Sequence, residues 1–139
     1  MNPVIHTETE HQLDVLARQK PHALLLTGPQ GIGLTSLAHK AIGETKAQVI
    51  TVLPEKNEKV DIEKGTLTVD SIRKLYDATR TKAPKGRVII IDYAERMAPA
   101  AQNAFLKLLE EPSSGTRFIL LTHVPELLLP TITSRAQRI

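Results

Sequence analysis

Residues 23–36 read Ala23-Leu24-Leu25-Leu26-Thr27-Gly28-Pro29-Gln30-Gly31-Ile32-Gly33-Leu34-Thr35-Ser36. The apolar residues that open this stretch are typical of a buried strand in a parallel sheet. The glycines that follow allow backbone N–H groups to face inward around a phosphate, and the helix expected from about Leu34 to Glu44 adds the positive end of its dipole. The stretch thus has the pattern of a phosphate-binding loop, Gly-x-x-x-x-Gly-Lys-Thr, with Leu34 at the lysine position. The alternative is a tight turn between strand and helix that simply requires glycine.

The loop retains one part of a nucleotide site and lacks another. Thr35 is placed to bind magnesium, whereas Leu34 cannot supply the positive charge that lysine places on the terminal phosphates. Loss of one charge-assisted contact costs about 1.5–3 kcal/mol, which corresponds to tenfold to more than a hundredfold in affinity. We therefore expect at best weak nucleotide binding and no cofactor, with ATP and magnesium in use only if the site still works as an ATPase. The candidate remnant positions in the loop are Gly28, Gly31, Gly33, Leu34 and Thr35.

A second motif lies at residues 88–92, which read Val-Ile-Ile-Ile-Asp. The β-branched run predicts a strand. An aspartate at such a strand end is where a Walker B motif holds magnesium through water, although Asp92 could also be a loop-forming aspartate. A glutamate follows directly in hydrolytic proteins of this kind, but here Tyr93 follows, and a tyrosine hydroxyl is a poor base at neutral pH. Glu95 is expected to be a solvated surface charge, so Leu34 and Tyr93 together argue against catalysis in this chain.

The remaining pattern predicts an α/β fold with a parallel sheet between helices. In such sheets ligands bind beyond the carboxyl ends of the strands, where Gly28 to Thr35, Asp92 and Thr122 are expected to converge. Strands are expected at 22–27, 48–53, 87–92 and 117–122, and helices at about 34–44, 69–81 with Thr68 as its cap, and 99–110. A capping box at 7–10 predicts an earlier helix, residues 54–64 a polar surface excursion, residues 125–129 a short helix, and residues 131–139 the approach to a last strand.

Composition limits the class of protein. A chain of 139 residues, 41% hydrophobic and 24% charged, is expected to form one soluble domain. The net charge of +3 permits an acidic partner or a DNA backbone without requiring one. Without cysteine, and with five histidines that show no ligand spacing, no metal site is expected. No signal segment or membrane helix is expected, so the cytoplasm is the expected location.

Several segments resemble the bacterial DNA polymerase III clamp-loader subunits. Residues 100–112, Ala-Ala-Gln-Asn-Ala-Phe-Leu-Lys-Leu-Leu-Glu-Glu-Pro, are similar to the "NALLKTLEEPP" helix of that family. Residues 118–126 resemble its sensor 1 strand, residues 67–75 resemble the segment before its Walker B strand, and residues 131–136 resemble its Ser-Arg-Cys motif with Ala136 in place of cysteine. The resemblance spans nearly the whole chain. The missing lysine and glutamate make the chain more similar to the delta-prime type than to the gamma type.

This resemblance implies a AAA+ (RecA-like) phosphate-loop core with a five-stranded, mostly parallel sheet flanked by helices. Residues 1–139 would be a single core domain that ends before the family's helical lid and collar. The four-cysteine zinc module of many family members is not expected here, because the corresponding residues 45–60 contain no cysteine. Arg135 of the Ser-Arg motif would reach across a subunit interface as an arginine finger for a neighbour's ATP. A surface arginine or an internal salt-bridge partner is the alternative for Arg135, and solvated charge is the expectation for Arg138.

The expected function is therefore that of a catalytically degenerate subunit that structures the clamp-loader ring. Its expected partners are the gamma/tau and delta types of subunit and, indirectly, the sliding clamp and primer-template DNA. Two alternatives remain: a weak ATPase of the gamma/tau type that tolerates Leu34, and a regulatory AAA+ module of another DNA-processing system.

Overall fold

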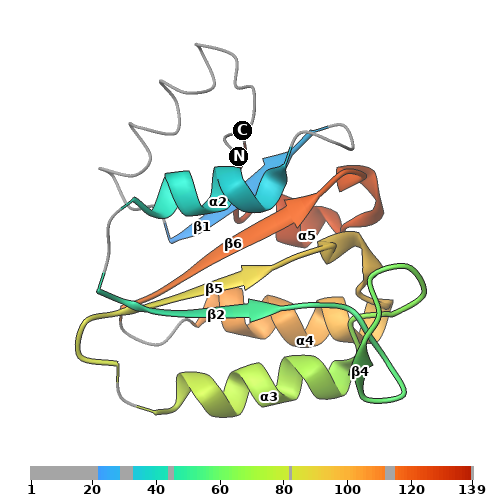
Figure 1. Ribbon diagram of the computed structural model, residues 1–139, viewed down its shortest axis with the longest axis horizontal. Coiled ribbons are helices and arrows are strands. Elements are labelled where there is room, and N and C mark those ends of the chain that lie inside the picture. The colour runs from blue at the N-terminus through green and yellow to red at the C-terminus, as the bar shows by residue number, and fades with distance from the viewer. Residues whose placement is uncertain (1–21, 29–32, 44–45, 82, 112–114, 139) are drawn as a thin grey trace.

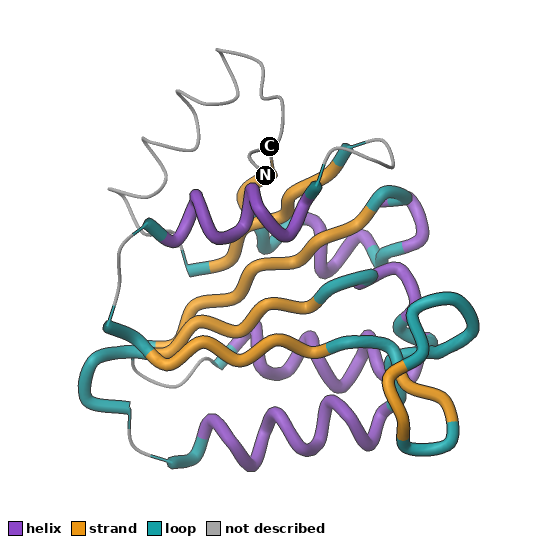
Figure 2. Tube along the Cα trace, viewed as in Figure 1, coloured by secondary structure: helices purple, strands orange, loops and turns teal. Residues whose placement is uncertain are grey.

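A central sheet separates two helical layers in the computed structural model (Figures 1 and 2). The structure describes residues 22–28, 33–43, 46–81, 83–111 and 115–138. Of residues 137 and 138 it describes the backbone and not the side chains. One helix, α2, covers one face of the sheet, while α3 and α4 cover the other (Figure 1). The helix expected from Thr7 lies outside the described residues.

The strands of the sheet are ordered β2-β5-β6-β1-β7, and every pairing between them is parallel. β5 is buried along its whole length, as its β-branched sequence predicts, whereas β2 lies at the edge and is largely exposed. The parallel sheet predicted from alternating strands and helices is thus confirmed. The strands are β1 (Ala23–Thr27), β2 (Gln48–Val52), β5 (Arg87–Ile91), β6 (Thr116–Thr122) and β7 (Gln137–Arg138).

The helices begin at residues with the expected local chemistry. Thr68 caps α3, because its hydroxyl accepts a hydrogen bond from the N–H of Ser71 at 3.2 Å. Pro99 occupies the first turn of α4, where its missing N–H removes no hydrogen bond. The helices are α2 (Leu34–Ile42), α3 (Val69–Thr79), α4 (Pro99–Glu110) and α5 (Pro130–Thr133), and the 3-10 helices are η1 (Ala94–Arg96) and η2 (Pro125–Leu127).

Two apolar cores form because alternate residues of each strand face opposite sides of the sheet. Leu25, Ile89 and Leu120 face α3 and α4 in one cluster. Leu24, Ile90 and Leu121 face α2 in the other. Burial on both faces explains why these strands read as continuous apolar runs rather than as alternating ones.

Three local expectations need correction. α2 ends at Ile42 rather than Glu44, because Gly43 adopts a φ of 70° that terminates the helix. The polar excursion at 54–64 contains a small hairpin of β3 (Glu55–Lys56) and β4 (Lys59–Val60), in which Asn57 and Glu58 take the positive φ values of a tight turn. The single short helix expected at 125–129 is instead η2, followed by the separate helix α5.

Within the described ranges, no helix is long and apolar enough to cross a membrane.

Candidate nucleotide site

The sheet has a switch point between β1 and β6. From β1 the chain passes through α2 to β2 at the far edge of the sheet, whereas from β6 it passes through α5 to β7 on the other side of β1. The two connections diverge, and in parallel sheets such a point is where a ligand crevice is expected, beyond the carboxyl ends of β1 and β6. Gly28 and His123 follow those two strand ends directly.

The loop that follows β1 is described at its two ends, while Gly31 lies outside the described residues. Gly33 takes a φ of 67° and a ψ of 58° immediately before α2, a left-handed conformation that favours glycine. This geometry aims the first turn of α2 toward the crevice. Thr35, in that turn, is exposed.

Leu34 is buried, with only 5% of its surface exposed, and packs in the core cluster between α2 and the sheet. A lysine at this position would carry its charge to the phosphates, but leucine contributes apolar contacts to the core instead. Leu34 therefore anchors the start of α2 in the core.

Thr35 and Asp92 come together although 57 residues separate them in sequence. The Thr35 hydroxyl donates to Asp92 Oδ2 at 3.4 Å, and the N–H of Tyr93 donates to Asp92 Oδ1 at 2.9 Å. Burial raises the pKa of Asp92 above its ordinary value of 3.8, and the bonds from Tyr93 and Thr35 and the charge of His123 partly oppose this rise. A hydroxyl and a carboxylate in contact are the pair that would hold Mg²⁺ beside a nucleotide.

Tyr93 stands where a hydrolytic site would place its glutamate. It is half-buried with a φ of 54°, a left-handed conformation uncommon for a tyrosine. The Arg96 guanidinium carbon lies 4.8 Å from the centre of its ring, a cation–π contact that holds the ring in place. No general base therefore occupies this position.

Glu95 differs from its expectation as a solvated charge. Its Oε2 atom is buried and has no hydrogen-bond partner among the described residues. The expectation is wrong for this oxygen, because it is shielded from solvent although the residue as a whole is half-buried.

His123 was missed by sequence reasoning. Its Nδ1–H donates to the carbonyl oxygen of Gly28 at 2.7 Å, which ties the end of β6 to the start of the loop. Thr122, which was predicted to be a site residue, is 1% exposed, and its hydroxyl accepts from the N–H of Val124 at 3.0 Å. The position of His123 in the sequence could have identified it, because it directly follows β6, the strand beside β1 at the switch point.

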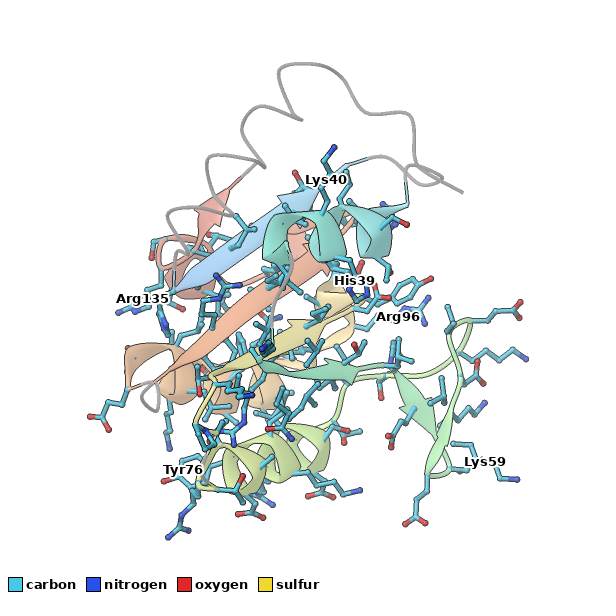
Figure 3. The ribbon with its side chains drawn as sticks, turned by 60° about the vertical axis from the view of Figure 1, so that its left-hand side comes forward. His39, Lys40, Lys59, Tyr76, Arg96 and Arg135 are labelled. Atoms are coloured by element: carbon cyan, nitrogen blue, oxygen red, sulfur yellow. The ribbon has the colours of Figure 1, made fainter. Side chains whose placement is uncertain are left out.

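Arg135 lies away from this crevice. Figure 3 places Arg135 and Arg96 on opposite sides of the molecule. The Arg135 Nη1 donates to the carbonyl oxygen of Thr131 at 2.8 Å, and Nη2 lies 3.2 Å from Glu110 Oε1 at the end of α4. Both side chains of this ion pair are 41–45% exposed. The ion pair with Glu110 agrees with the alternative that Arg135 is an internal salt-bridge partner. In this position the guanidinium does not reach the contact of Thr35 with Asp92.

Comparison with known proteins places the chain in a family. The family described as "DNA polymerase III, delta subunit" matches residues 40–139. The chain belongs to this family.

The relatives of this chain include subunits of both the delta-prime and the tau type. The chain is 36% identical to the DNA polymerase III subunit delta' of Pseudomonas aeruginosa, in an alignment that covers 84% of this chain and 42% of the relative. It is 34% identical to subunit delta' of Escherichia coli, over 89% of this chain and 37% of the relative. It is 33% identical to subunit tau of Bacillus subtilis, over 96% of this chain and 27% of the relative. The chain therefore spans less than half the length of these relatives. The predicted resemblance to the delta-prime type is confirmed.

Solved structures share the fold. A DNA polymerase III gamma subunit-related protein from Thermotoga maritima superposes with a TM-score of 0.73 at 24% identity, over 94% of this chain and 44% of that one. The Holliday junction branch migration motor RuvB of the same organism superposes with a TM-score of 0.68 at 19% identity, over 97% of this chain and 44% of that one. The AAA+ fold predicted for this chain is thus confirmed.

Proposed function

We propose that this chain is the non-catalytic AAA+ module of a clamp-loader subunit, which helps to load the sliding clamp for DNA replication. It would structure the ring and contribute Arg135 to the ATP site of a neighbouring subunit. Its partners would be subunits of the gamma/tau and delta types, with the clamp and primer-template DNA contacted through the assembly. Membership of the delta-subunit family and identity to delta' proteins support this role.

The observation that carries the proposal is the pairing of two replacements in one site. Leu34 is part of the core, and Tyr93 is held beneath Arg96, so the loop cation and the base are both absent. Thr35 and Asp92 remain in contact, which favours residual binding of magnesium and nucleotide without turnover. The same contact is what supports the alternative of a weak ATPase of the gamma/tau type.

Arg135 is the residue proposed to act in trans. Its ion pair with Glu110 is half-exposed, and such pairs contribute about 0.2–1 kcal/mol. Exchanging Glu110 for a neighbour's phosphate therefore costs little. A guanidinium that stabilises developing charge on a transferred phosphoryl group gives about 10³–10⁵ in rate in other enzymes.

The test is a reconstituted assembly with an ATP-hydrolysing subunit of the gamma/tau type. Arg135→Ala should change the chain's stability by no more than about 0.5 kcal/mol and should lower the partner's DNA-stimulated ATPase by about tenfold or more. Arg135→Lys should rescue poorly, because an ammonium lacks the planar fork.

Glu110→Gln is the matched control, since it removes the same ion pair and keeps the arginine with its hydrogen bond to the carbonyl oxygen of Thr131. It should leave the partner's ATPase intact. A loss of ATPase in Glu110→Gln equal to that in Arg135→Ala would mean that the ion pair matters, not the finger, and the trans role would fail.

A further inference from the structure

A hollow of about 390 Å³ lies at the amino-terminal edge of the sheet, the edge opposite the candidate nucleotide site. Its lining residues come from the starts of β5 and β6, the loop that precedes β5 and the end of α2. Its volume is in the range of small-ligand sites. The residues that line it are His22, Ile42, Ala47, Lys85, Gly86, Arg87, Val88, Gly115, Thr116 and Arg117, and we call it the basic hollow.

Among the described residues that line the basic hollow, the charged side chains are cationic. Lys85 precedes β5, Arg87 begins it, and Arg117 lies on β6 opposite Val88. No aspartate or glutamate is found among these described lining residues. A neighbouring hollow of about 400 Å³ shares Lys85 and adds Lys46, and its described lining also holds no carboxylate. For a chain with a net charge of only +3, this is a local concentration of positive charge.

The Arg117 side chain has no hydrogen bond or ion pair with any other residue that the structure describes. It is half-buried, and burial lowers the pKa of its guanidinium, which means that the surroundings oppose its charge. A bound anion would offset this cost.

Arg87 is 2% exposed, and its side chain donates to neutral groups. Nε donates to Gln48 Oε1 at 3.0 Å, and Nη2 donates to the carbonyl and hydroxyl oxygens of Thr81 at 2.9 and 2.8 Å. These bonds satisfy donors without cancelling the charge. The buried guanidinium therefore adds a fixed positive potential beside the hollow.

We propose that the basic hollow binds phosphate groups, carried either by a nucleic-acid backbone or by a phosphorylated small molecule, with Arg117 and Lys85 as the contacting cations. Arginine provides a fork that matches phosphate oxygens, and lysine provides a point charge, the two modes by which proteins hold phosphate. This site is separate from the proposed function, because neither residue belongs to the crevice of Thr35 and Asp92 or to the Arg135 ion pair.

The experiment measures binding of pyrophosphate by calorimetry and of a labelled single-stranded oligothymidylate by fluorescence anisotropy at several salt concentrations. Arg117→Gln and Lys85→Gln should each weaken binding about tenfold. For the oligothymidylate each should also reduce the salt slope by about 1. Lys59→Gln removes the same charge from the exposed β4 strand on another part of the molecule (Figure 3) and should leave binding unchanged.

The two probes distinguish the sources of phosphate. Binding of the oligothymidylate alone would support the nucleic-acid backbone, binding of pyrophosphate alone would support a small molecule, and binding of both would support the shared site. Lys85 is exposed, so Lys85→Gln keeps the test valid if Arg117→Gln unfolds. The proposal fails if neither probe binds, if both variants bind as the parent does, if Lys59→Gln weakens binding equally, or if poly-glutamate binds as tightly as the phosphate probes.

Discussion

At the scale of a single residue, Leu34 belongs both to the glycine-rich loop motif and to the apolar core under α2. The side chain that replaces the loop cation packs in the α2 cluster, beside residues from β1, β5 and β6. Restoring the cation therefore removes apolar contacts, and the two effects can be measured separately.

We expect Leu34→Ala to destabilise the chain by about 2–5 kcal/mol, because it opens a cavity under α2. Leu34→Lys should also lower stability, but it should tighten ADP binding by about tenfold, since it returns a charge-assisted phosphate contact. Urea unfolding and calorimetry measure the two effects. Leu34→Met keeps the volume and should cost less than about 1.5 kcal/mol. An unchanged urea midpoint for Leu34→Ala would contradict the role of Leu34 in the core.

Asp92 gives a pH dependence of defined sign. The pKa of Asp92 in the folded chain is raised above its ordinary value of 3.8. At a pH between the ordinary pKa and the folded-state pKa, the folded chain therefore binds more protons than the unfolded chain. Stability contributed at this position is thus highest below 3.8 and decreases as pH rises through the folded pKa.

Asp92→Asn should remove this decrease, since an amide can still accept from the N–H of Tyr93. The variant should be at least as stable as the parent at pH 7 and should lose this advantage in acid. Urea midpoints measured from acid to neutral pH test the prediction. A parent whose stability at this position rises with pH, relative to Asp92→Asn, would refute it.

At the scale of an element, α3 depends on its first turn. The Thr68 side chain accepts from the N–H of Ser71, and this helix then buries Ile72 and Leu75 against the sheet. The cap and the apolar stripe were both readable from the sequence because they depend on local spacing.

We expect Thr68→Ala to destabilise the chain by about 1 kcal/mol, with a range of about 0.5–2. Thr66→Ala is the control, because Thr66 is exposed and its hydrogen bonds with Glu55 are made by the backbone. The control should stay within about 0.5 kcal/mol of the parent. Thermal or urea unfolding of the two variants measures the difference. An equal loss of unfolding free energy in Thr68→Ala and Thr66→Ala would contradict the capping role of Thr68.

At the scale of the whole molecule, the sheet brings three distant segments to one edge. The turn of Thr35, the end of β5 and the end of β6 meet there because the strands are parallel and their carboxyl ends share an edge. The residues of the proposed nucleotide site therefore lie at one edge of the sheet, although they come from distant parts of the sequence.

We expect the chain by itself to release phosphate from ATP no faster than background, in magnesium and excess ATP. ADP and ATP should bind with dissociation constants no tighter than the high micromolar range, about −5 to −6 kcal/mol. Turnover that disappears in Asp92→Ala would show that the site is active. A low-micromolar constant would show that the loop tolerates Leu34.

The main strands and helices, the order of the motifs and the family could be predicted from the sequence, whereas the hairpin of β3 and β4 could not. Strand β5, the cap of α3 and the extent of α4 follow from local patterns whose physical basis spans a few residues. The replacements at Leu34 and Tyr93 were also visible, because each stands at a fixed offset within a motif.

Only the tertiary structure decided what these residues touch. The contact of His123 with Gly28, the ion pair of Arg135 with Glu110, the buried oxygen of Glu95 and the cations of the basic hollow each depend on segments far apart in the sequence. Side-chain periodicity indicates which face a residue occupies, but not which residue of another element lies opposite. That pairing is set by strand order and register, and these form only when the whole sheet assembles.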